Sequence, residues 1–127
     1  MTRQEALLQL RKAKSAHIRW RAFVQAMVAG LEVSEDKAPA HPKDCDFGNW
    51  FYKEGFQSFG HWPVYLDVEY AHEMLHDVYH LLHRARKSGE HMEVERLAVQ
   101  LTAISYSLLE LMALFEEEIR LAEQDAF

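Results

Sequence analysis

The sequence predicts an all-α protein: an antiparallel four-helix bundle with a short extra helix that carries the cysteine. Apolar residues recur at steps of three and four along three long segments, which is the spacing of a helix with one buried face. No segment shows the alternation of a half-buried strand, and no Asn-Gly or Asp-Gly pair marks a hairpin turn. Because 127 residues suffice for one core, we expect a single domain over residues 1–127.

The first long helix is predicted over about residues 3–29. A histidine interrupts its otherwise apolar inward stripe, which consists of Leu10, Ala13, His17, Trp20, Val24, Met27 and Leu31. Gly30 is placed to end the helix as a C-terminal cap, because glycine readily adopts the left-handed conformation found there.

A loop and a short helix are predicted next. Residues 31–44 contain two prolines among polar side chains, which indicates an exposed connection. Aromatic residues then favour a short helix over residues 44–59. Asp44 stands where an N-cap belongs, so Cys45 is expected in the first turn.

Two more long helices complete the predicted fold. The first starts near Pro63, ends at Ser88-Gly89, and has the inward stripe Val68, His72, Leu75, Tyr79 and Leu82, with His76 one turn away. The last covers about residues 90–123 and has a fully apolar stripe: Leu97, Leu101, Ile104, Leu108, Leu111, Phe115 and Ile119.

Composition excludes several classes of function. Acidic residues outnumber basic ones 20 to 14, the formal net charge is -6, and no basic block is present, so we expect no nucleic-acid partner. Charges interrupt the N-terminal residues, and no apolar run looks long enough to span a membrane, so we expect a cytoplasmic protein without a membrane partner. A single cysteine cannot form an internal disulfide, and a reducing compartment keeps it as a thiol.

Three histidines and the cysteine offer a complete set of zinc ligands. Residues four apart on a helix lie above one another, so His72 and His76 can reach one ion. His17 lies on the inward stripe of another helix, where a buried imidazole needs a polar partner or a metal. Cys45 completes a tetrahedral His3Cys set, although a lone cysteine is also a common apolar core residue.

The order and spacing of these residues resemble the chemoreceptor zinc-binding domain family. The family pattern is a histidine followed three residues later by an aromatic residue, then Cys-x-apolar-Gly-x-apolar, then His-x-x-x-His. The matching residues are His17 with Trp20, Cys45 with Phe47, Gly48 and Trp50, and His72 with His76. The resemblance implies that His17, Cys45, His72 and His76 bind Zn2+.

The resemblance also implies a function. The family is a bacterial regulatory module, tends to be homodimeric, and is found fused to cytosolic chemoreceptors or to diguanylate cyclases, where it reports zinc or oxidants such as hypochlorous acid. This chain carries neither a chemotaxis signalling helix pair nor a cyclase domain. We therefore expect a free-standing, non-enzymatic sensor that signals to a separate chemoreceptor or cyclic-di-GMP signalling protein.

The proposed signal depends on Cys45. Neighbouring Asp44 and Asp46 oppose the effect of the helix N-terminus on the thiol, so the sequence alone leaves its ionisation open. A bound divalent cation deprotonates a coordinating thiol, and the thiolate is the oxidisable form. Oxidation of Cys45 would weaken the metal site and release its segment.

Three other metal functions fit parts of the pattern. His72-Glu73-x-x-His76 matches a zinc hydrolase motif, but His17 and Cys45 would fill the position a substrate needs. Glu69 and Glu73 give two Glu-x-x-His motifs, but a di-iron site needs such motifs on two helices. The same four ligands also fit a protein that binds zinc structurally or buffers it, and this alternative is kept. The other histidines are predicted to be surface or packing residues: His41, His61, His80, His83 and His91.

Overall fold

The computed structural model describes residues 1–34 and 36–123, and the regular structure in this range is entirely helical. The prediction of an all-α protein is therefore confirmed. The elements are α1 (Arg3–Val28), α2 (Asp46–Trp50), the π-helical turn η1 (Phe51–Gly55), α3 (Phe56–Phe59), α4 (Pro63–Lys87) and α5 (His91–Leu121).

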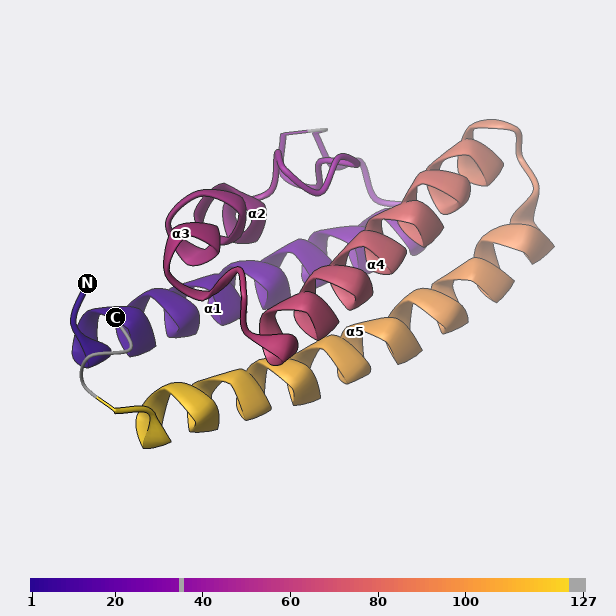
Figure 1. Ribbon diagram of the computed structural model, residues 1–127. Coiled ribbons are helices and arrows are strands. Elements are labelled where there is room, and N and C mark those ends of the chain that lie inside the picture. The colour runs from indigo at the N-terminus through magenta and orange to yellow at the C-terminus, as the bar shows by residue number, and fades with distance from the viewer. Residues whose placement is uncertain (35, 124–127) are drawn as a thin grey trace.

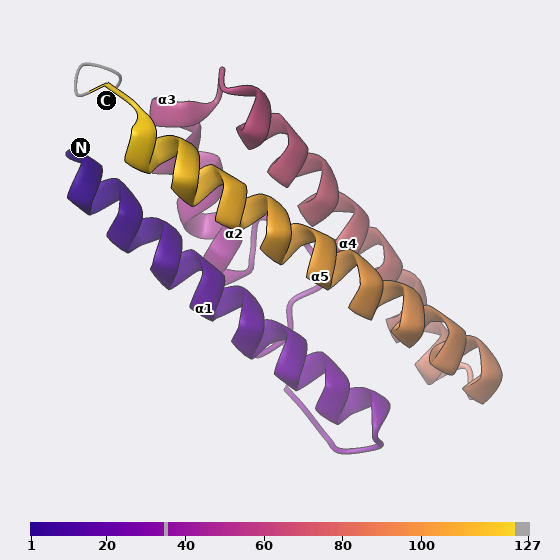
Figure 2. The ribbon, with the colours of Figure 1, turned by 90° about the horizontal axis from the view of Figure 1, so that it is seen from below.

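Three long helices and one short helical segment make up the fold. α1, α4 and α5 lie side by side, with α5 running opposite to the other two, and the α2–η1–α3 segment packs beside α1 and α4 (Figures 1 and 2). The Arg3 side chain at the start of α1 donates to the carbonyl groups of Ile119 and Ala122 at the end of α5. The described residues thus form three long helices and one short helical segment, while the four-helix bundle with a short extra helix stays a prediction.

The helix ends follow local sequence signals. Thr2 and Glu5 form a capping box at the start of α1, and Pro63 occupies the first turn of α4. Gly30 and Gly89 both have positive φ where the chain leaves α1 and α4, as the sequence predicted. The N-cap prediction for Asp44 was wrong, because Cys45 itself is the N-cap of α2.

The core confirms most of the predicted inward stripes. Every predicted position of α1 and α4 is buried except Leu31, which follows the end of α1 and is exposed. The stripe of α5 is partly wrong. It consists of Val94, Leu97, Leu101, Ser105, Leu108, Met112, Phe115 and Ile119, so Ser105 and Met112 replace two predicted neighbours, Ile104 and Leu111, which are only half-buried.

The last helix is also the most hydrophobic. α5 contains an 18-residue window with mean hydropathy 1.6, so its length and composition are those of a helix that can cross a membrane. This finding differs from the prediction that no apolar run approaches that length. Core helices of soluble proteins meet the same criteria, and 28% of this window is buried in the structure.

Candidate metal centre

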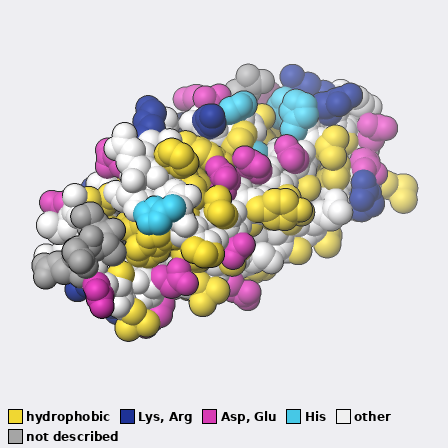
Figure 3. Space-filling model, viewed as in Figure 1, with side chains coloured by type: hydrophobic (Ala, Val, Ile, Leu, Met, Phe, Trp, Pro, Cys, Tyr) yellow, Lys and Arg dark blue, Asp and Glu magenta, His cyan; other side chains and the backbone are white. Residues whose placement is uncertain are grey.

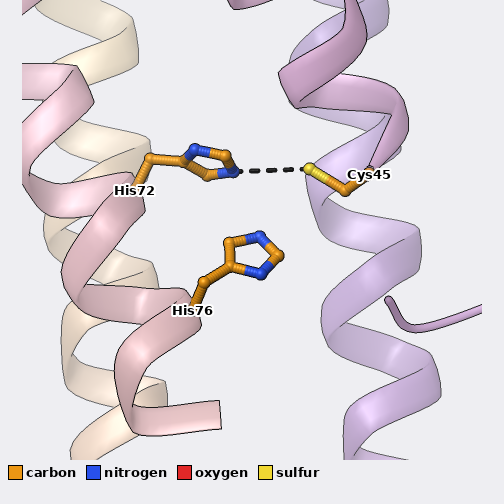
Figure 4. Close-up of side chains that lie close together, drawn as sticks. All are labelled: Cys45, His72 and His76. Atoms are coloured by element: carbon orange, nitrogen blue, oxygen red, sulfur yellow. Dashed lines mark hydrogen bonds between the residues drawn. The ribbon is translucent and has the colours of Figure 1, made fainter. Parts of the chain in front are cut away.

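Three of the four predicted ligands meet in the interior. The donor atoms of Cys45, His72 and His76 all lie within 4.8 Å of one another, and all three side chains are buried. The two imidazoles project from α4 toward the sulfur at the start of α2 (Figure 4). The Sγ of Cys45 lies 3.4 Å from Nε2 of His72.

The backbone around Cys45 fixes the position of its sulfur. As the N-cap of α2, the Sγ accepts a hydrogen bond from the Gly48 amide at 3.2 Å, and as a thiol it donates to the Pro42 carbonyl at 3.3 Å. A Cβ on residue 48 would lie 1.8 Å from the Pro42 oxygen, so only glycine permits this close approach. This requirement explains the glycine three residues after the cysteine.

Burial suppresses ionisation of the thiol in the metal-free protein. Desolvation raises the pKa of Cys45 to about 11, and the charge of Asp46 adds to the effect, while the Gly48 amide opposes it. Without a cation, Cys45 is therefore a neutral thiol at neutral pH. A divalent cation beside the sulfur reverses this preference.

The backbone carbonyl of Ala40 sets the tautomer of His76. Nδ1 lies 2.8 Å from this oxygen, and because a carbonyl only accepts, Nδ1 carries the proton. Burial lowers the pKa of His76 to about 4, so the ring is neutral near pH 7. Its Nε2 lone pair is then available for a metal ion.

His72 is held by aromatic neighbours. Its ring lies 4.5 Å from the Phe47 ring, centroid to centroid, and its Nδ1 lies 3.5 Å from the Tyr52 hydroxyl in η1. Desolvation, with smaller contributions from the charges of His76 and His17, lowers the pKa of His72 to about 2. His72 is accordingly a neutral donor.

The loop before Cys45 is attached to the site at several points. Carbonyl groups of Ala38, Pro39 and Ala40 accept hydrogen bonds from Tyr79, Trp20 and His76 respectively. The Trp20 ring also lies 4.8 Å from the His76 ring, which explains an aromatic residue three positions after His17. The prediction of an exposed connection was therefore only partly right, because Ala38 is buried.

His17 lies outside the group of three close donors. It is buried on α1 as predicted, but its Nε2 lies 2.9 Å from the Ser105 hydroxyl on α5. Arg21, one turn later on α1, donates to the same hydroxyl at 3.3 Å. Desolvation, with smaller contributions from the charges of Arg21 and His76, lowers the pKa of His17 to about 4.

Ser105, the buried partner of His17, is a polar core residue that the sequence did not reveal. It is completely buried, yet the apolar periodicity of α5 selected its neighbour Ile104 for that position. The available signal was a small polar residue four positions after Leu101 and three before Leu108 on an otherwise apolar face.

The three close donors have the composition of a zinc site. Thiolate and imidazole are the ligands of structural zinc sites, and the bond lengths of such sites place neighbouring donors about 3.3 to 3.6 Å apart. The Cys45–His72 separation of 3.4 Å falls in this range. The group contains no carboxylate, so it does not have the composition of a di-iron centre.

The remaining candidates lie away from these donors. Glu73 is exposed and Glu69 is half-buried, so neither belongs to the buried group. The other histidines agree with the prediction that they are surface or packing residues. The exposed ones are His41, His61, His80 and His91, and His83 is half-buried.

Comparison with known proteins agrees with the geometry. Residues 17–82, more than half of the chain, match the chemoreceptor zinc-binding domain, and this range includes the three clustered donors and His17. No curated protein and no solved structure matches the chain. The chain belongs to the chemoreceptor zinc-binding domain family.

Proposed function

We propose that this protein is a cytoplasmic regulatory protein that binds one zinc ion through His17, Cys45, His72 and His76 and reports zinc or an oxidant. The observation that carries the proposal is the buried group of one thiol and two neutral imidazoles in a member of a zinc-binding family. A fourth donor from His17 would close the coordination shell, as in zinc sites without catalysis. The proposal therefore assigns no enzymatic activity.

Oxidant sensing would use the sulfur of Cys45. Bound zinc would supply the thiolate form, which the metal-free protein disfavours. The overall reaction with hypochlorous acid converts the thiolate to a sulfenic acid and releases chloride, so sulfur is oxidised by two electrons and chlorine is reduced. A cavity of about 270 Å³ is lined by Trp20, Pro39 and Cys45 among others, and would let a small oxidant approach the residue that carries the sulfur.

The signal would be a movement of the Cys45 segment. The four proposed ligands come from α1, from the residue before α2 and from α4. Losing the sulfur ligand would release α2 from the two long helices, a local change that a partner protein can detect. From the family resemblance, we propose that this partner is a chemoreceptor or a cyclic-di-GMP signalling protein.

We further propose that two copies of the chain associate through α4 and α5. Exposed hydrophobic residues gather on these helices, and a groove of about 480 Å³ between them is lined by Tyr70, Met74, Ile104 and Leu111 among others. Hydrophobic and acidic side chains are interspersed over the molecular face in Figure 3. Contact between two such faces would bury apolar surface that the single chain leaves in water.

A structural or zinc-buffering role is the second candidate. It uses the same ligands but requires no response to oxidant. A zinc hydrolase is less well supported, because Glu73 is exposed and does not belong to the buried donor group. Oxidant-dependent zinc release separates the first two functions, since a purely structural role requires the site to keep its metal when one equivalent of oxidant is added.

The test is zinc binding and release in wild type and in Cys45→Ser. We expect one zinc per wild-type chain, release of that zinc by one equivalent of hypochlorous acid, and at least tenfold weaker binding with no oxidant response in the variant. His80→Ala, which changes an exposed histidine on the same helix as two proposed ligands, is the control and should match wild type. Equal zinc affinity in wild type and Cys45→Ser would refute the assignment.

A further inference from the structure

A buried hydrogen bond joins the fourth proposed ligand to a different helix. The Nε2 of His17 on α1 lies 2.9 Å from the Oγ of Ser105 on α5, and the exposed fractions of the two side chains are 2% and 0%. Arg21 also contacts this oxygen, with its Nη1 at 3.3 Å. The hydroxyl is thus the polar partner that a buried imidazole needs.

His17 must move to become a metal ligand. Neither of its ring nitrogens belongs to the group in which donor atoms lie within 4.8 Å of one another. Tetrahedral zinc requires separations of about 3.3 to 3.6 Å. The ring is nevertheless a neighbour of the site, because the Trp20 ring lies 6.0 Å from the His17 ring and 4.8 Å from the His76 ring, centroid to centroid.

We propose that Ser105 competes with zinc for His17, an inference that rests on the proposed zinc-binding function. Without zinc, the Ser105 hydroxyl on α5 holds the His17 imidazole by a hydrogen bond. To bind zinc together with the other three ligands, His17 must break this hydrogen bond. Ser105 is not left unsatisfied by this exchange, because Arg21 remains within hydrogen-bonding distance. Only one of its two hydrogen bonds is lost.

The exchange changes the link between α1 and α5. The His17 to Ser105 bond connects residues 88 positions apart and lies in the middle of the two helices, while the Arg3 contacts tie their outer ends. Zinc binding would therefore replace a connection between α1 and α5 by one between α1 and α4. Occupancy of the buried site would be transmitted to α5, which carries part of the proposed dimer face.

If Ser105 supported zinc binding instead of competing with it, the expected change in zinc affinity would have the opposite sign. If the hydroxyl oriented a zinc-bound His17, the bond would persist in the loaded protein and its removal would weaken zinc binding. That arrangement requires Nδ1 of His17 to lie close to the other donors while Nε2 stays on Ser105. The geometry of the three-donor group does not include such a nitrogen.

The test is the zinc affinity of Ser105→Ala, measured by competition with a chromophoric chelator. We expect the variant to bind zinc about threefold to tenfold more tightly than wild type, which is the equivalent of one neutral buried hydrogen bond. Ser107→Ala removes an exposed hydroxyl from the same helix and should leave the affinity unchanged. In a His17→Ala background, Ser105→Ala should have no effect, because the competed ligand is absent.

A second readout does not depend on affinity. Nitrogen-15 chemical shifts of the His17 ring should show a hydrogen-bonded Nε2 in the metal-free wild type and a changed Nε2 environment when zinc is added. Unchanged or weaker zinc binding by Ser105→Ala would overturn the competition while leaving zinc binding itself intact. Failure of wild type to bind any zinc would overturn both the proposed function and this inference.

Discussion

The amide of Gly48 and the carbonyl of Pro42 hold the cysteine from two sides. Gly48 donates to the sulfur of Cys45, and the Pro42 oxygen, which accepts from the thiol, would lie only 1.8 Å from a Cβ on residue 48. The loop and the first turn of α2 thus pack backbone against backbone. This close approach fixes the sulfur opposite the imidazoles of α4.

Gly48→Ala should destabilise the fold and weaken zinc binding together. The added methyl group would collide with backbone atoms of the loop, which cannot relieve the clash by a change of rotamer. We therefore expect a loss of about 1 to 3 kcal/mol in the free energy of unfolding. Urea denaturation and zinc titration measure the two effects. Gly55→Ala is the matched control, because its Cβ would meet the Trp50 side chain at 3.4 Å. Equal behaviour of the two variants would contradict the packing argument.

Tyr79→Phe should loosen the loop that carries Ala40. The Tyr79 hydroxyl donates to the Ala38 carbonyl at 2.8 Å, and Ala38 is buried, so the variant leaves an acceptor without this donor. We expect a loss of about 1 to 3 kcal/mol in unfolding free energy. Tyr70→Phe removes an exposed hydroxyl from the same helix and should have little effect. Faster amide hydrogen exchange near Ala40 in Tyr79→Phe alone would confirm the mechanism; identical exchange in both variants would contradict it.

The metal-free protein should lose stability as the pH falls below about 6.5. Burial lowers the pKa values of His17 and His76 to about 4, whereas both titrate near 6.5 in the unfolded chain. Between these values the unfolded state binds more protons, so unfolding becomes easier as the pH decreases. Each buried histidine contributes a slope approaching about 1.4 kcal/mol per pH unit. Urea denaturation of chelated protein at pH 7 and pH 5 checks this, and equal stabilities would show that the imidazoles are not buried as neutral groups.

A charge introduced on the α4 and α5 face should dissociate the proposed dimer. Tyr70 is 67% exposed and lines the groove between these helices, so Tyr70→Glu would place a carboxylate in the contact. Light scattering after size-exclusion chromatography should give a dimer for wild type and a monomer for the variant. Leu8→Glu introduces the same charge at an exposed position of α1 and should remain dimeric. A monomeric wild type would refute the dimer.

Much of the fold was predictable because its signals are local. The inward stripes of α1 and α4 follow from the spacing of apolar residues, and the glycines and Pro63 mark helix ends through their backbone preferences. The register of α5 was less predictable. Ile104 and Ser105 are adjacent, and the rotation that buries the serine depends on a polar partner, His17, on another helix.

Three of the predicted ligands lie close together in the fold, but their arrangement was not predictable from the sequence. The spacing of His72 and His76 and the family pattern identified donors that the fold does bring together with Cys45. Sequence spacing contains no information on the carbonyl groups of residues 38–42, which orient Cys45 and His76 through the backbone. Nor does it show that His17 faces Ser105, since that contact depends on how two distant helices pack.

X-ray absorption spectroscopy of the zinc-loaded protein tests the central claim most directly, because it counts the nitrogen and sulfur atoms bound to the metal. We predict one sulfur at about 2.3 Å and three nitrogens at about 2.0 to 2.1 Å, with the sulfur absent in Cys45→Ser and one nitrogen lost in His17→Ala. A zinc spectrum without sulfur in the wild-type protein would contradict the account.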